Sequence, residues 1–284
     1  MPSWARYDTW NVGIATLDRP LEHVADLLPL RNVRWLPPQP PQQYVADPFP
    51  YRHGDRDWLL VEQYGHPRGG RGIIARIDAS SPATATPAIV RDRHVSYPYV
   101  FSDGTRTLCT PDMNQEDGCV VYALGADGAW TPAHHILLGA RIVDPTVFRW
   151  NGRWWLFGAA PPPRHTTTLN VFHAESVEGP WIAHHANPVK HDVASARPGG
   201  RPFVVNGRLY RPAQDSSDTY GGALHVMEIV ALTPDDFHER IALRLDPDPR
   251  WPYPDGLHHL VLDGTRVYFD AKRTHINWPR RRRR

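Results

Sequence analysis

Polar residues of different kinds occupy matching positions in a repeated strand pattern of this 284-residue chain. The residues that open the repeated strands are Asp47, Tyr97, Asp144, Arg197 and His258. The residues that close the returning strands are Glu62, Asp112, Gln214, Asp215 and Asp270. Repeat positions with only a structural role would favour similar small or apolar residues, so this polar diversity indicates a functional site.

Two carboxylates, Asp47 and Asp144, are the strongest catalytic candidates. A pair of carboxyl groups can break a glycosidic bond by acid–base chemistry, and inverting enzymes hold the two groups about 6.5–9.5 Å apart. Asp47 and Asp144 belong to the first and third repeats, which are not adjacent, so they can face each other across a cavity. One carboxylate would then act as the base while the other tunes its pKa, with help from Arg197.

The elements that must position these side chains form a regular repeat. The prolines that follow four of the strand-opening residues, Pro48, Pro98, Pro145 and Pro198, lie 50, 47 and 53 residues apart. Turn pairs such as Asn151-Gly152 come after them. Asn-Gly and Asp-Gly pairs are typical of hairpins, because type I′ turns need positive φ angles. Each repeat has room for four strands, which make one propeller blade.

The sequence therefore predicts an all-β fold, a five-bladed β-propeller. The expected blades lie near residues 44–92, 93–140, 141–192, 193–245 and 250–278. A strand over residues 8–15 is expected to pair with the last blade and close the ring, and a short N-terminal helix is expected between Asp18 and Leu28. We expect residues 1–279 to form a single domain and residues 280–284 to form a solvated basic tail. A β-sandwich is the alternative, but it gives no reason for the regular spacing of the prolines.

The composition indicates no special class of partner. The formal net charge is +2, and no stretch reads as an export leader, a membrane span or a phosphate-binding loop. We therefore expect a cytoplasmic protein with a small-molecule or glycan substrate, no nucleic-acid or membrane partner and no cofactor. The preference for arginine, with Lys190 and Lys272 as the only lysines, is typical of a GC-rich bacterial genome. No metal site is expected, although His258 is left open as a ligand for an ion in the cavity.

Several short motifs resemble those of known propeller families. Ala46–Phe49, Asp144–Phe148 and Ser176–Trp181 are similar to motifs of glycoside hydrolase family 43 and its five-bladed relatives. A closer resemblance is to a bacterial and plant group that resembles the N-terminal domain of glucosamine inositolphosphorylceramide transferase. The segments that carry it are Ser96–Pro98, His184–Val189, Ala196–Gly199, Tyr210–Asp215 and Gly256–His258. Together the two resemblances cover roughly residues 35–275 and imply the propeller fold.

The resemblance also implies roles for individual residues. In family 43 the first-blade aspartate is the base and the third-blade aspartate tunes its pKa, which would give these roles to Asp47 and Asp144. The family's acid is a glutamate that opens the fourth blade, but this chain has Ala196-Arg197-Pro198 there. Glu62 or Asp112 could supply a displaced acid. The expected substrate-binding residues are Tyr97, Arg197, Arg211, Gln214, Asp215 and His258.

Three kinds of function remain open at this stage. The first is a glycoside hydrolase-like enzyme that acts on a sugar or sugar-like substrate in the central cavity. The second is an enzyme of another reaction class, such as a transferase, lyase or cyclase, in a cytoplasmic biosynthetic pathway. The third is a non-catalytic glycan-binding module in which aromatic residues such as Tyr97 and Tyr220 stack on sugar rings. The absence of the fourth-blade glutamate favours the second over the degradation of polymers.

Overall fold

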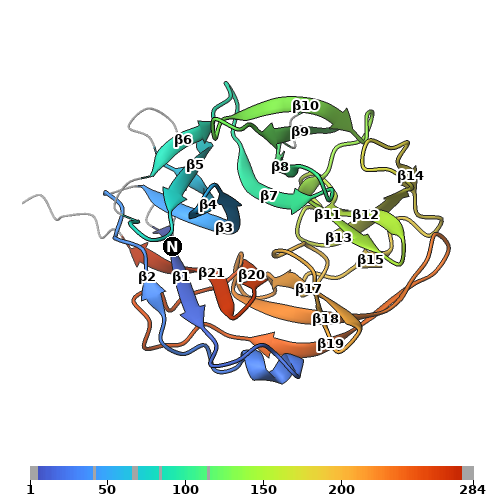
Figure 1. The fold of residues 1–284 in the computed structure, drawn as a ribbon. Helices are drawn as coiled ribbons and strands as arrows, with labels where there is room; N and C mark the ends of the chain where they lie inside the picture. The colour runs from blue at the N-terminus through green and yellow to red at the C-terminus, as the bar shows by residue number, and fades with distance from the viewer. Residues whose placement is uncertain (1–5, 41–42, 66–69, 83–84, 114–115, 277–284) are drawn as a thin grey trace, which may run out of the picture.

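The protein is a ring of five sheets. The structure, a computed structural model, describes residues 6–276 except 41–42, 66–69, 83–84 and 114–115. The described residues form antiparallel sheets that are arranged as blades around a central axis (Figure 1). This arrangement confirms the predicted all-β five-bladed propeller. The predicted tail at residues 280–284 lies outside the described residues, and the single domain over residues 1–279 stays a prediction.

Blades 1 to 4 are each built from strands that follow one another along the chain. Blade 1 contains β3 (Tyr44–His53), β4 (Arg56–Tyr64), β5 (Gly72–Asp78) and β6 (Thr86–Ile89). Blade 2 contains β7 (Ser96–Ser102), β8 (Thr107–Asp112), β9 (Cys119–Leu124) and β10 (Trp130–Ile136). Blade 3 contains β11 (Val143–Trp150), β12 (Arg153–Ala159), β13 (Thr168–Ala174), β14 (Ile182–Ala183) and β15 (Lys190–His191). Blade 4 contains β16 (Phe203–Val205), β17 (Arg208–Asp215), β18 (Ala223–Leu232) and β19 (Phe237–Leu245).

Blade 5 joins the two ends of the chain. It consists of β20 (Leu260–Asp263), β21 (Arg266–Ile276), β1 (Arg6–Thr16) and β2 (Arg34–Trp35). Strand β1 pairs with β21 along its whole length, from Arg6 opposite Ile276 to Thr16 opposite Arg266. The predicted ring-closing strand is therefore confirmed, and it gives the first and last segments a shared sheet (Figure 1).

The expected helix between Asp18 and Leu28 is not formed. Only a turn of 3₁₀ helix, Val24–Leu27, occurs in this segment. The carboxylate of Asp26 accepts the backbone N–H of His23 at 2.8 Å, so the turn begins several residues later than Asp18. The turn ends at once because Leu28 precedes a proline, which disfavours the helical region for the residue before it. Leu28 is accordingly extended, with φ −112° and ψ 146°.

Burial falls from the axis of the propeller to its rim. In the innermost strand β3, every residue from Val45 to Tyr51 is buried, because this strand packs against blades on both sides. The outermost strand of blade 4, β19, alternates between exposed and half-buried residues along most of its length. Period-two alternation of this kind is expected where only one face of a strand meets the core.

Aromatic rings fill the middle of the axis. The ring centroid of Phe49 lies 5.2 Å from those of Tyr97 and Tyr99 and 4.6 Å from that of His259. These edge-to-face contacts join blades 1, 2 and 5 and separate the two ends of the axis. We call the end where β3, β7 and β11 begin the strand-start mouth, and the opposite end the strand-end mouth.

Candidate active site

The inner strands of blades 1 to 3 share a strained bulge at the strand-start mouth. The register between first and second strand shifts at the same place in each of these blades. The residue inside the bulge has a positive φ of 52° at Asp47, 44° at Tyr97 and 55° at Asp144. Such angles cost a non-glycine residue on the order of 1–3 kcal/mol, and they cluster at functional sites. The strain therefore falls on three of the residues that the sequence singles out.

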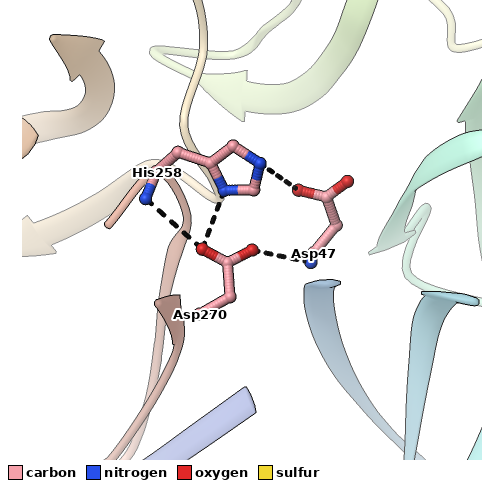
Figure 2. Close-up of side chains that lie close together, drawn as sticks. All are labelled: Asp47, His258 and Asp270. Carbon is pink, nitrogen blue, oxygen red and sulfur yellow. Dashed lines mark hydrogen bonds and ion pairs between the residues drawn. The ribbon is translucent and has the colours of Figure 1, made fainter. Parts of the chain in front are cut away.

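A buried cluster of three residues joins blades 1 and 5 at this mouth (Figure 2). His258 Nδ1 lies 2.7 Å from Asp270 Oδ1, while His258 Nε2 lies 4.0 Å from Asp47 Oδ1. The backbone N–H of Asp47 donates to Asp270 Oδ2 at 2.9 Å, which offsets part of the cost of the bulge. Asp270 thus orients both the imidazole ring and the strained backbone that carries Asp47.

Burial and neighbouring charges shift the pKa values of all three groups. Burial raises the pKa of Asp47 to about 7, against the opposing effect of His258. Burial alone would lower the pKa of His258, but the Asp270 carboxylate outweighs it and raises that pKa above the usual value. Burial would raise the pKa of Asp270, but the facing imidazoles hold it below the usual value. Asp270 therefore favours the protonated form of His258, and Asp47 is poised between its two protonation states near pH 7.

Glu62 is a second carboxyl group with a raised pKa. It belongs to β4, where it pairs with Ala46, the residue before Asp47. Burial raises its pKa well above the usual value, and the charges of Asp47 and Asp112 raise it further. His94 Nε2 lies 3.7 Å from Glu62, but burial lowers the pKa of His94, so this imidazole is neutral at pH 7. Burial therefore favours the protonated form of Glu62, which lies next to a carboxyl group whose pKa is raised to about 7.

Asp144 occupies a different environment, because a cation pairs with it. Arg197 Nε donates to Asp144 Oδ2 at 2.6 Å, and both side chains are buried. Gln214 Nε2 donates to the same oxygen at 3.2 Å and to the carbonyl of Pro198 at 2.8 Å. Arg197 and Gln214 are thus engaged with Asp144 through hydrogen bonds to its carboxyl group.

Two aromatic residues complete the mouth. The ring of Trp10 stacks on the imidazole of His258 at a centroid distance of 3.9 Å. The ring of Tyr220 lies 5.2 Å from the Arg197 guanidinium and 5.6 Å from the ring of His258, and 40% of this residue is exposed. Sequence reasoning missed Trp10, although its place in the ring-closing strand was the available clue. It named Tyr220 only as a stacking residue.

Three of the expected substrate-binding residues are engaged elsewhere. The hydroxyl of Tyr97 lies 2.9 Å from Thr146 Oγ1 and accepts the N–H of Gly200 at 3.1 Å, inside the axis rather than at the mouth. Arg211 donates to both oxygens of Glu239 at 2.6 Å, in a buried ion pair of blade 4. Asp215 pairs with Arg244 and accepts the N–H of Ser217 at 3.0 Å, where it supports the loop that leads to Tyr220. The hydrogen bonds that these three side chains make go to protein partners, although Arg211 Nη1 has none, so their part in substrate binding stays a prediction.

The cluster in Figure 2 also has the donor atoms of a cation site. Asp47, His258 and Asp270 each offer one ligand atom, and these atoms lie within 4.8 Å of one another. Carboxylate oxygens and an imidazole nitrogen suit several divalent metals. The expectation that the chain binds no metal thus remains a prediction, and His258 is the residue on which it depends.

The fold and the mouth together define a five-bladed propeller with a cluster of buried ionisable residues at one mouth. Solved structures with the same fold include Zg3597, a family 117 glycoside hydrolase from Zobellia galactanivorans, with a TM-score of 0.56 and 13% identity over 95% of this chain and 91% of that one. The GH43_1 enzyme from Xanthomonas citri, solved with xylotriose, has a TM-score of 0.54 and 12% identity over 74% of this chain and 78% of that one. At these identities the likeness establishes the fold alone.

Sequence comparison gives the family. Residues 37–249 match the family described as glucosamine inositolphosphorylceramide transferase 1, N-terminal, and the chain belongs to this family. The enzyme named glucosamine inositolphosphorylceramide transferase 1 from Oryza sativa subsp. japonica is 32% identical over 209 residues, and the one from Arabidopsis thaliana is 30% identical over 210. Each match covers 70% of this chain but only 28% and 27% of the respective relative.

These relatives overturn one expectation about the cell and leave a second without support. The prediction of a cytoplasmic protein is wrong, because the matching relatives are transferases named for inositolphosphorylceramide, and a ceramide is a membrane lipid. They are plant proteins, so they do not support the expected bacterial source. Within the part of the chain that the structure describes, no helix is long and apolar enough to cross a bilayer.

Proposed function

We propose that this chain is a carbohydrate-active enzyme that uses Asp47 as a general base and Glu62 as a general acid at the strand-start mouth. The observation that carries the proposal is a pair of buried carboxyl groups on neighbouring strands, both of which have raised pKa values. Burial raises the pKa of Asp47 to about 7 and raises that of Glu62 well above its usual value. Buried carboxyl groups with raised pKa values are typical of acid–base sites in enzymes.

The proposed reaction replaces one bond at a sugar carbon with another. Asp47 takes a proton from an attacking hydroxyl, whose oxygen forms a bond to the sugar carbon. The bond from that carbon to the leaving oxygen breaks, and Glu62 gives its proton to this oxygen. The Asp144–Arg197 pair and the Asp270–His258 pair hold the local charges in place during the reaction. We assign Glu62 rather than Asp112 as the acid because burial among carboxyl groups raises the pKa of Glu62 and so favours its protonated form.

A sugar substrate is supported by the mouth and by the relatives. Tyr220 provides exposed aromatic surface beside His258, and aromatic faces suit the apolar faces of sugar rings, while the buried Trp10 stacks on the imidazole. The curated relatives are named as transferases that involve glucosamine, and the Xanthomonas citri enzyme was solved with xylotriose. Hydrolysis and transfer differ only in the attacking hydroxyl, which is water in the first case and a hydroxyl of an acceptor in the second. The names of the relatives favour transfer.

A panel of sugar donors tests the proposal. We expect the protein to release p-nitrophenol from at least one p-nitrophenyl glycoside, or to consume a nucleotide sugar when an inositol phosphate acceptor is present. Asp47→Asn and Glu62→Gln should each reduce turnover by about 10²–10⁴-fold. The matched controls are Asp117→Asn and Glu175→Gln, which change carboxylates that are 66% and 79% exposed. If the protein binds sugars but turns none over, it is a glycan-binding module and not an enzyme. If turnover is unchanged in both Asp47→Asn and Glu62→Gln, the assignment of these two residues as base and acid is refuted.

A further inference from the structure

A second hollow lies at the strand-end mouth, away from the proposed active site. Its volume is about 390 Å³. Its wall comes from the ends of the inner strands of blades 1 to 3, including Tyr51, Phe101 and Phe148, and from Arg201 of blade 4. Asp47 and Asp144 lie at the beginnings of the same strands. The packed rings of Phe49, Tyr97 and Tyr99 stand between the two places.

The charge of this hollow has one sign. Arg52, Arg149 and Arg201 contribute to its wall, and no aspartate or glutamate is among its lining residues. None of the three arginines forms an ion pair within the part of the chain that the structure describes. The three arginines therefore bring positive charge to the wall of the hollow, and no carboxylate among its lining residues balances that charge.

Arg201 is the residue at the base of the hollow. Its Nη2 donates to the carbonyl oxygens of Val100 at 2.9 Å and Pro50 at 3.4 Å, which fixes the guanidinium between blades 1 and 2. Its Nε is buried and has no hydrogen-bond partner. A buried donor without a partner is costly, and a cation in such a position is normally paired. Arg201 is thus held in place by the backbone while part of its hydrogen-bonding capacity is unused.

Aromatic side chains form the rest of the wall. Phe101 and Trp154 contact each other with their ring centroids 6.1 Å apart, and Tyr51 and Phe148 lie on either side. All four are at most 9% exposed, so their positions are fixed by the core. The hollow consequently offers rigid apolar surface next to three cations, which suits a ligand with a ring and an anionic group.

We propose that the strand-end mouth binds a phosphate monoester whose organic part is a small ring. A phosphate monoester carries a charge of about −1.5 to −2 at pH 7, which matches several guanidinium groups better than a single carboxylate does. The planar fork of arginine binds phosphate oxygens in pairs. The ring of the ligand packs against Phe101 and Trp154. This site is separate from the strand-start mouth, so the proposal does not depend on the proposed reaction.

Titration calorimetry with phenyl phosphate tests the site. We expect saturable binding of one phenyl phosphate per chain, weaker binding of inorganic phosphate and no binding of phenol. Each of Arg52→Gln and Arg149→Gln should weaken phenyl phosphate binding by about tenfold, because each removes a charge-assisted hydrogen bond. Both arginines are exposed, so the variants should fold.

The matched control is Arg31→Gln, which changes an exposed arginine outside the hollow and should leave the affinity unchanged. The proposal is overturned if phenyl phosphate does not bind at millimolar concentration, or if phenol binds equally well. It is also overturned if benzoate binds more tightly than phenyl phosphate, or if Arg31→Gln weakens binding as much as the other two variants. Loss of sugar turnover in an Arg52 or Arg149 variant with intact phosphate affinity would contradict the separation of the two mouths.

Discussion

Asp47 combines a strained backbone with a poorly solvated carboxyl group. Its φ is 52°, it is 6% exposed, and its pKa is raised to about 7. Neither feature favours folding, and both are features that active sites retain for function. The protonation of this single residue therefore gives the most direct test of the proposed function.

The pH dependence of turnover follows from the ionisation of Asp47. A base must be deprotonated, so we expect kcat/KM to fall about tenfold per pH unit as the pH drops below 7. Activity should fall again at higher pH, when Glu62 loses the proton that it donates. The pH profile of kcat/KM measures both limits. A profile that is flat down to pH 5 would contradict the role of Asp47.

The stability of a Glu62→Gln variant gives a test that does not need a substrate. The folded-state pKa of Glu62 lies well above the ordinary 4.5, so its protonated form is favoured by folding. Its stabilising effect is complete below pH 4.5 and is lost as the pH rises through the folded-state pKa. Glutamine cannot ionise, so the variant should gain about 1 kcal/mol per pH unit over the wild type across that window. Denaturant unfolding at pH 5 to 8 measures the gain, and Glu175→Gln should show none.

The sequence identified most of the residues of this mouth but not their division of labour. The repeat was sufficient to select Asp47, Asp144, Arg197 and His258, because equivalent positions in a propeller meet at one place. It could not show that Arg197 is occupied by Asp144, or that Arg211 pairs with Glu239 instead of facing the mouth. Those outcomes depend on the side of a twisted strand to which each side chain points. They also depend on a β-bulge in which a residue before proline has a positive φ, a conformation that such residues do not normally adopt.

At the scale of elements, blades 4 and 5 are joined at their inner edges by a backbone bridge at a glycine, and not by a regular strand pairing. Gly200 has a φ of 135° and pairs with Leu260 in an isolated parallel bridge. A Cβ atom at this position would lie 1.9 Å from the carbonyl oxygen of Leu260. The inner strand β16 begins only at Phe203, so the segment before it depends on this close approach. The sequence predicted the blade but not this substitute for regular pairing.

Gly200→Ala should therefore destabilise the protein by at least about 2 kcal/mol, because the added methyl group clashes with backbone that cannot move independently. The control is Gly207→Ala, at a φ of 74° with no neighbouring atom within 4 Å, where only the unfavourable φ remains. That control should cost about 1–2 kcal/mol. Thermal unfolding of the two variants measures the difference, and equal losses would show that the contact with Leu260 carries no energy.

At the scale of the whole molecule, the ring closes through one pairing. Strand β1 lies between β21 and β2 in blade 5, and it also carries Trp10, which stacks on His258. Closure protects the edge of β21, since an unpaired edge strand promotes aggregation. The fold was predictable because a proline-marked repeat of regular length and a separate N-terminal strand leave few other arrangements. Function was less predictable, because propellers carry many functions.

A chain that begins at Leu17 should fail to form a soluble, cooperatively unfolding monomer, because it lacks the strand that pairs with β21. A chain that lacks only residues 1–5 is the control and should behave as the full chain does. Size-exclusion chromatography and thermal unfolding distinguish the two. A stable monomer without β1 would show that ring closure is dispensable.

The central claim is that this mouth holds two carboxyl groups, Asp47 and Glu62, with raised pKa values. Carbon-13 NMR titration of the aspartate and glutamate carboxyl groups measures those values directly, without knowledge of the substrate. We expect one aspartate carboxyl to titrate near pH 7 and to disappear from the titration in Asp47→Asn. We also expect one glutamate carboxyl to titrate well above 4.5 and to disappear in Glu62→Gln. If every carboxyl group of the wild type titrates below about pH 5, as ordinary carboxyl groups do, the acid–base account is contradicted.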